Sequence, residues 1–99
     1  MEKKELNEIC EKLNIFINTH QEEFLSQGEY IDINFSVSDS KKEIYLISDN
    51  GSSKINCDFD KLKAIVDKGV SSSLIIDIYR NDGEDLNTIL DIYFNKINN

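Results

Sequence analysis

The spacing of hydrophobic residues changes once, near residue 30, and this change constrains the fold more than any other feature of the sequence. From residue 3 to residue 26 the apolar positions recur in steps of three and four, as on one face of an amphipathic helix. The stripe consists of Leu6, Ile9, Cys10, Leu13, Phe16, Ile17, His20 and Phe24. From Ile31 to Val37 apolar and polar residues alternate, which is typical of a half-buried strand. A helix followed by a strand indicates an α+β fold.

Two turn signals follow the alternating segment and predict a three-stranded antiparallel meander. SDSKK at 38–42 separates the first strand from EIYLIS, and DNGS at 49–52 separates EIYLIS from SKINCDF. Asn50-Gly51 is a strong hairpin signal, because a type I′ turn needs positive φ at both central residues. The expected strands are 31–37, 43–48 and 53–59.

Both turns place the apolar side chains on one face of this meander. The expected loops are Asn50-Gly51 and a tight turn centred on Asp39-Ser40. A slip of one residue would turn the whole apolar set towards water, so the register is well specified. The expected cross-strand pairs are Leu46–Ile55, Ile44–Cys57, Phe35–Ile44 and Ile33–Leu46.

The second half of the chain predicts a helix and then a fourth strand. DFDKLKAIVDKG at 58–69 begins with a capping residue, Asp58 or Asp60, and ends at Gly69. VSSS at 70–73 reads as a linker. LIIDIYR at 74–80 alternates in period two, which favours a strand with Ile76 facing inward and Tyr79 facing outward.

The pentamer IIDIY at 75–79 recurs almost unchanged as ILDIY at 89–93, and the second copy fits two structures. Residues 88–94 alternate like the return strand of a hairpin, but 86–97 also carry a helical stripe. Three observations favour the helix. The stripe is long for a strand, and the link from residue 80 is long for a hairpin loop. Acidic residues also precede the stripe, where the helix dipole favours negative charge. We therefore expect a helix at 84–97. The expected order is α-β-β-β-α-β-α, a two-layer sandwich in one domain of 99 residues.

The net charge of −8, from 19 acidic and 11 basic residues, makes DNA and anionic membranes poor partners. Proteins with basic clefts are better partners, although solubility alone also explains an acidic surface. The N-terminal MEKKELNEIC lacks the apolar segment of a signal peptide, and no apolar run approaches the length of a membrane span. The expected location is the cytoplasm.

A search for catalytic and cofactor-binding motifs finds none, so we expect no enzyme, no cofactor and no metal site. His20, the one histidine, falls on the apolar stripe of the first helix. Cys10 and Cys57 also fall at apolar positions, which indicates reduced, buried thiols. Asp32 and Asp77 resemble a pair of glycosidase carboxylates only if their strands are neighbours, and exposed mid-strand positions explain both.

The remaining feature is a polar surface on the strand faces opposite the core. Three of the four tyrosines fall there beside carboxylates, and tyrosine is enriched at binding hot spots. Plain cross-strand pairing on an exposed sheet is the alternative explanation. With the acids near residue 82, the candidate partner-binding residues are Tyr30, Asp32, Tyr45, Asp77, Tyr79, Asp82, Glu84 and Asp85.

These observations favour a stoichiometric protein inhibitor without catalysis. Its most natural form is an immunity protein that neutralises a toxin, often a nuclease with a basic active site. The alternative is a phage-encoded inhibitor of a defence nuclease, of the anti-CRISPR or anti-restriction type, that presents carboxylates where DNA phosphates would lie. A third class, a small secretion or assembly chaperone, would use an apolar groove and would form a dimer.

Overall fold

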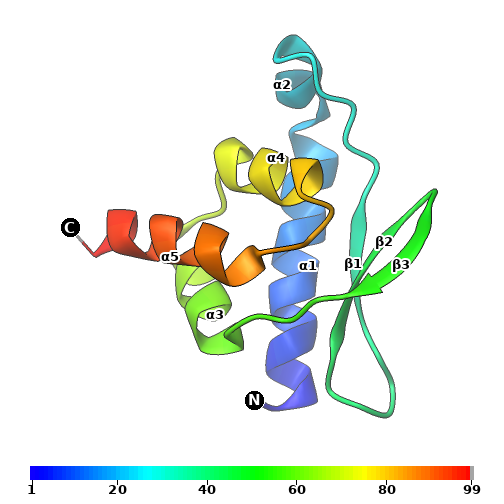
Figure 1. The fold of residues 1–99 in the computed structure, drawn as a ribbon, viewed down its shortest axis with the longest axis vertical. Coiled ribbons are helices and arrows are strands. Elements are labelled where there is room, and N and C mark those ends of the chain that lie inside the picture. Colours follow the sequence, from blue (N-terminus) through cyan, green and yellow to red (C-terminus); the bar gives the residue numbers. More distant parts are fainter. Residues whose placement is uncertain (99) are drawn as a thin grey trace.

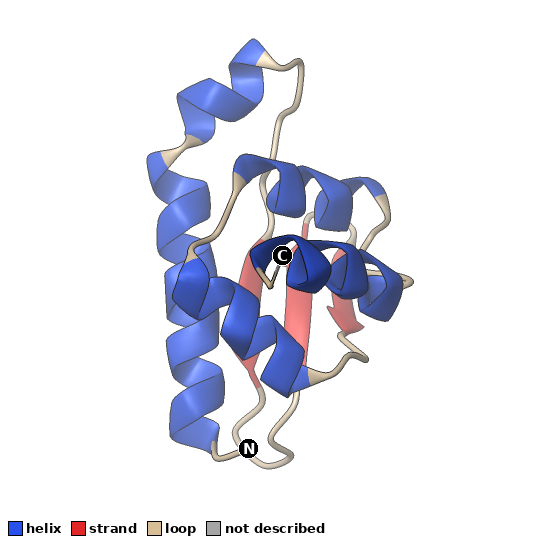
Figure 2. Ribbon diagram, turned by 90° about the vertical axis from the view of Figure 1, so that its left-hand side faces the viewer, coloured by secondary structure: helices blue, strands red, loops and turns tan. Residues whose placement is uncertain are grey.

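The computed structural model describes residues 1–98, which fold into five helices and one three-stranded antiparallel sheet (Figure 1). The mixed helix-and-sheet class predicted from the sequence is confirmed. Figures 1 and 2 show the helices to one side of the sheet. The elements are α1 (Lys3–Thr19), α2 (Gln21–Ser26), β1 (Asn34–Val37), β2 (Ile44–Ser48), β3 (Gly51–Lys54), α3 (Phe59–Lys68), α4 (Ser72–Arg80) and α5 (Leu86–Ile97).

The expected helix over 3–26 is interrupted at His20, which divides it into α1 and α2. The His20 ring stacks on Phe16 with centroids 3.8 Å apart, and its Nδ1 lies 2.8 Å from the Phe16 carbonyl oxygen. Thr19 Oγ1 also donates to the Phe16 carbonyl oxygen. The His20 amide also donates to the Phe16 carbonyl at 3.1 Å, so helical hydrogen bonding continues up to the break at His20. Ile17 and Phe24 are nevertheless both buried, so the stripe continues across it.

Both hairpins are shifted by two residues from the expected register. Phe35 pairs with Leu46, and Leu46 pairs with Ser53, whereas the sequence predicted Ile33 and Ile55 as the partners of Leu46. Because the shift is even, every side chain stays on the face predicted for it. The inward-facing apolar residues are accordingly buried: Ile33, Phe35, Ile44, Leu46 and Ile55.

The β2–β3 turn uses Gly51 but is not the expected type I′ turn. Ser48 pairs with Gly51, so the two-residue loop is Asp49-Asn50. Gly51 has a φ of 118°, whereas Asn50 is not among the residues with positive φ. The strand also ends earlier than the predicted 53–59, because residues beyond Lys54 lead directly into α3.

The predicted fourth strand at 74–80 is wrong, because this segment is helix α4. Ser71, which the sequence placed in a linker, caps the helix by accepting a hydrogen bond from the Leu74 amide at 3.2 Å. Leu74, Ile76 and Ile78 alternate as in a strand, but all three are buried on one side of a short helix together with Ile75. Period-two alternation cannot distinguish such a helix from a strand. The order is therefore α-α-β-β-β-α-α-α, and it replaces the expected α-β-β-β-α-β-α.

The other two helix predictions of the second half are confirmed. Helix α3 is capped by the Asp58 carboxylate, which accepts hydrogen bonds from the amides of Asp60 and Lys61. Helix α5 packs mainly on α3 and also on α4, and it buries Leu86, Ile89 and Leu90. The repeated pentamer is thus helical in both copies.

Within residues 1–98, every buried side chain is apolar. These side chains form one cluster, which the helices and the sheet both contribute to. Cys10 belongs to it, and Cys57 is half-buried at its margin. Burial raises the pKa of the Cys10 thiol to about 11, and burial together with the Asp58 charge raises that of Cys57 to about 12. Both thiols are free and stay uncharged near neutral pH, which makes them poor nucleophiles. No helix within residues 1–98 has the length and apolar character needed to cross a membrane.

The turn at Gly51 can be tested by substitution. Gly51→Val should lower the free energy of unfolding by about 1 kcal/mol or more, because a β-branched residue resists positive φ. Ser52→Val, at an exposed strand position next to it, should change stability by less than about 0.5 kcal/mol. Urea denaturation measures both. Equal losses in the two variants would show that the φ of residue 51 carries no special cost.

Candidate functional site

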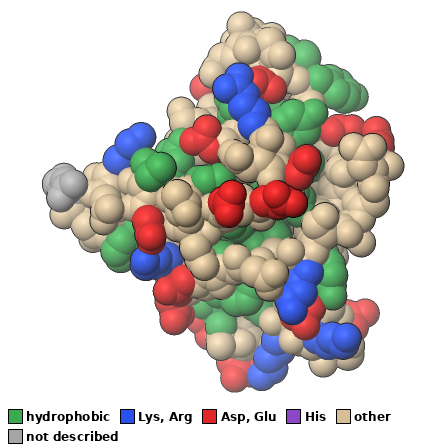
Figure 3. Space-filling model, viewed as in Figure 1, with side chains coloured by type: hydrophobic (Ala, Val, Ile, Leu, Met, Phe, Trp, Pro, Cys, Tyr) green, Lys and Arg blue, Asp and Glu red, His purple; other side chains and the backbone are tan. Residues whose placement is uncertain are grey.

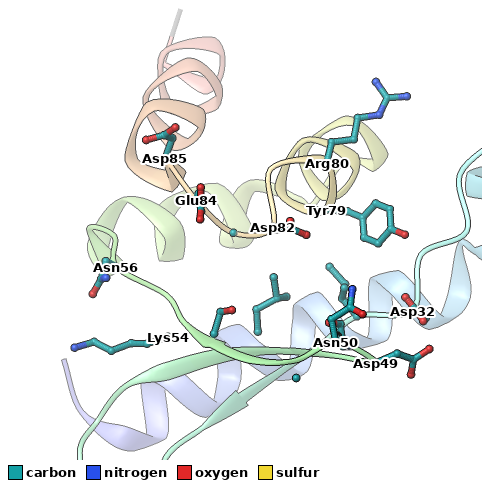
Figure 4. A pocket seen from close by; sticks show the side chains of 16 residues that line it. Asp32, Asp49, Asn50, Lys54, Asn56, Tyr79, Arg80, Asp82, Glu84 and Asp85 are labelled. Atoms are coloured by element: carbon teal, nitrogen blue, oxygen red, sulfur yellow. Dashed lines mark hydrogen bonds between the residues drawn. The ribbon is translucent and has the colours of Figure 1, made fainter.

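An open groove of about 1050 Å³ separates the β2–β3 hairpin from the turn between α4 and α5 (Figure 4). We call it the acidic groove. Ile33 and Leu46 contribute its only aliphatic lining among the described residues, and both are nearly buried. Its carboxylates are Asp32, Asp49, Asp82, Glu84 and Asp85. Figure 3 shows acidic side chains gathered near the centre of this face of the molecule.

The α4–α5 turn (residues 81–85) holds three of these acids in a defined conformation. Asp82, Gly83 and Asp85 have left-handed backbones, with φ of 53°, 74° and 50°. Glycine and aspartate adopt this conformation at least cost, which explains the sequence NDGED. The Gly83 amide donates to the Ile78 carbonyl at 3.0 Å, and the Glu84 amide donates to the Asn81 carbonyl at 2.8 Å. These bonds fix the turn at the end of α4.

The two basic residues that line the groove do not neutralise its carboxylates. Arg80 Nε donates to Glu29 at 2.6 Å, and Figure 4 shows the Arg80 side chain directed away from the groove. Lys54 Nζ lies 3.8 Å from a Glu43 oxygen, outside the acidic cluster. Within residues 1–98 none of the five groove carboxylates forms an ion pair. The groove therefore carries uncompensated negative charge.

Two of the carboxylates are neighbours at one end of the groove. Asp32 precedes β1 and Asp49 lies in the β2–β3 loop, yet the two carboxyl groups are close enough to interact. Asp32 raises the pKa of Asp49 above its usual value, first because it can accept a hydrogen bond from the protonated Asp49 carboxyl and next through its negative charge. Two neighbouring acids repel one another when both are ionised. A cationic side chain placed between them would relieve that repulsion.

Five of the eight predicted partner-binding residues line this groove: Asp32, Tyr79, Asp82, Glu84 and Asp85. Asp32 and Tyr79 do not lie on the outer faces of strands that the sequence predicted for them, because Tyr79 lies on α4. Asp82, Glu84 and Asp85 lie on the turn that follows α4. Asp32 comes instead from the segment before β1. The groove is thus assembled from three separate parts of the chain.

The other three predicted residues lie elsewhere. Tyr30 is 67% exposed and does not line the groove. Tyr45 donates its hydroxyl to Glu43 at 2.9 Å. Asp77 faces α5, where it accepts a hydrogen bond from the Tyr93 hydroxyl at 2.6 Å. Asp49 and Asn56 also line the groove, although neither is among the eight predicted residues.

No three His, Cys, Asp or Glu side chains in the described part of the chain are arranged to hold a metal ion. Comparison with protein-family models, curated proteins and solved structures finds no match to the chain. The assignment of a function therefore rests on the geometry and charge of the chain itself.

The Asp77–Tyr93 contact assigns Asp77 a structural role that substitution can test. Burial, and next the hydrogen bond to Asp77, raise the pKa of the Tyr93 hydroxyl, so the hydroxyl remains a donor at neutral pH. Tyr93→Phe should destabilise the fold by about 1 kcal/mol or more, because it leaves a half-buried carboxylate without this donor. Tyr30→Phe, the matched change at an exposed hydroxyl, should be neutral within about 0.5 kcal/mol. Chemical denaturation that ranks both variants equally would contradict this role.

Proposed function

We propose that the chain is a non-catalytic, stoichiometric inhibitor that binds a basic, nucleic-acid-handling protein in the cytoplasm. Its most natural form is an immunity protein that neutralises a nuclease-type toxin. The observation that supports this proposal is the acidic groove, whose five carboxylates lack ion pairs within residues 1–98. A basic cleft built to hold phosphates is complementary to such a surface.

The binding mechanism follows from long-range and then short-range electrostatics. The net charge of −8 attracts a basic protein from a distance and speeds the encounter. At contact, the groove carboxylates accept hydrogen bonds from Lys and Arg side chains that would otherwise hold nucleic acid. The inhibitor then blocks the nucleic-acid site by occupying it. Direct binding of nucleic acid or of an anionic membrane is not part of this proposal, because both repel an acidic surface.

The same unpaired carboxylates suit the alternative form, a phage-encoded inhibitor that mimics DNA phosphates to block a defence nuclease. The two forms share one surface and differ only in the partner. A chaperone would instead need an exposed apolar groove, whereas the two aliphatic residues that line the acidic groove are nearly buried. The groove therefore favours an inhibitor of basic proteins over a chaperone.

Charge-neutralising variants test this proposal once the partner has been captured from the source cell and identified by mass spectrometry. The double variant Asp82→Asn/Glu84→Gln should raise the Kd of the complex about tenfold or more at about 0.02 M salt, where screening is weak. Affinity of the unmodified chain should fall as salt rises to about 0.15 M. Isothermal titration calorimetry at both salt concentrations measures these changes.

A matched control separates local contact from total charge. Glu22→Gln/Glu23→Gln removes the same two charges from the first turn of α2, which does not line the groove. This control should change the Kd by no more than about threefold, because charges outside a contact act mainly on the association rate. Equal losses in the two double variants, or affinity that ignores salt, would refute the proposed binding site.

A further inference from the structure

One wall of the acidic groove is the free edge of the sheet. β3 pairs with β2 on one side and with no strand on the other, within residues 1–98. Gly51, Ser53 and Lys54 of this strand line the groove. All four residues of β3 are exposed, so the backbone along this edge is accessible.

The hydrogen-bonding pattern identifies which backbone groups are unused. The Ile55 amide donates to the Ile44 carbonyl at 2.8 Å, which makes Ile55 a hydrogen-bonded position of the antiparallel ladder. Such positions alternate, so Ser53 and Gly51 also turn their amide and carbonyl groups towards β2. Ser52 and Lys54 therefore point theirs outward. No backbone partner for these outward groups is found among the described residues.

The opposite edge of the sheet is already occupied. The Asn14 side chain, from α1, donates to the Phe35 carbonyl at 2.9 Å and accepts from the Phe35 amide at 2.8 Å. One side chain thus satisfies both outward backbone groups of Phe35 in the way a neighbouring strand would. The β3 edge, which borders the groove, has no such cover.

We propose that β3 binds an extended basic segment of the partner protein, which joins the sheet as an added strand and places alternate Lys or Arg side chains in the acidic groove. This inference rests on the proposed function and specifies how the partner binds. Side chains of an added strand alternate between the two faces of the sheet. One set of these side chains would lie on the same face of the sheet as Leu46 and Ser53, the face that lines the groove. Asp82 and Glu84 on the α4–α5 turn lie across the groove from that face (Figure 4).

Charge argues for a basic segment over a second copy of this chain. Two copies paired at their β3 edges would bring two acidic grooves together, each chain carrying a net charge of −8. Like charges placed across an interface oppose association. A segment with Lys or Arg at alternate positions meets the same carboxylates with the opposite charge.

Two synthetic peptides of about ten residues and equal composition test the strand mode. One alternates Lys with Thr and Val, and the other gathers its Lys residues in one block. If the added strand forms, the full chain should bind the alternating peptide about tenfold more tightly than the block peptide at low salt, because only the alternating peptide directs its charges to one face. Fluorescence anisotropy of labelled peptides measures the ratio.

A backbone substitution tests the edge itself. Ser52→Pro removes an outward amide that β2 does not use, and edge positions of this kind tolerate proline. It should weaken binding of the alternating peptide about tenfold or more, whereas Ser52→Thr should stay within about twofold. Two N-methylated forms of the alternating peptide provide a second test, which leaves the protein unchanged. One form is methylated at the odd-numbered peptide residues and the other at the even-numbered ones. Only the form whose methylated amides face β3 should lose binding.

Several outcomes would overturn the added strand. If both peptides bind equally, and neither Ser52→Pro nor N-methylation has an effect, then charge alone accounts for peptide binding. Asp82→Asn/Glu84→Gln would then still weaken both peptides, and the proposed function would stand. Absence of any binding would reject strand addition as well. A dimer seen by sedimentation and abolished by Ser52→Pro would assign the edge to a second copy.

Discussion

The contact between Gly83 and Leu46 holds the acidic groove in shape. It joins the α4–α5 turn to β2, two parts of the chain that share no strand pairing. A Cβ atom at residue 83 would lie 3.2 Å from Leu46 Cδ2, and the φ of 74° also favours glycine. A larger residue would be strained at this φ, and the Leu46 side chain would have to shift to admit its Cβ atom. The positions of Asp82 and Glu84, on either side of Gly83, depend on that close approach.

The sequence predicted correctly those elements whose hydrophobic pattern fits only one type of secondary structure. The meander was predicted on the correct faces even though both registers differ by two residues, because an even shift leaves the apolar set inside. The failure at α4 has a physical cause. Leu74, Ile76 and Ile78 of this short helix also alternate along the chain, so their spacing fitted a strand as well as a helix.

The acids of the site were predictable, but their arrangement was not. NDGED carries an evident cluster of acids, and all three of these acids line the groove. The position of these acids opposite the β2–β3 hairpin depends on residues 72–80 being helical. As helix α4, this segment brings the turn that follows it over β2. Asp49 was missed because a turn explains an aspartate there without any further role. The proximity of Asp49 to Asp32 is a tertiary feature with no local signal in the sequence.

The most direct test of the account is a map of the partner's contact on the full chain. Amide hydrogen exchange with and without the captured partner measures protection residue by residue. The account predicts that protection on binding concentrates in β3 and in the α4–α5 turn, the two walls of the acidic groove. Protection confined to α1 and α2, with residues 51–54 and 82–85 unchanged, would contradict it.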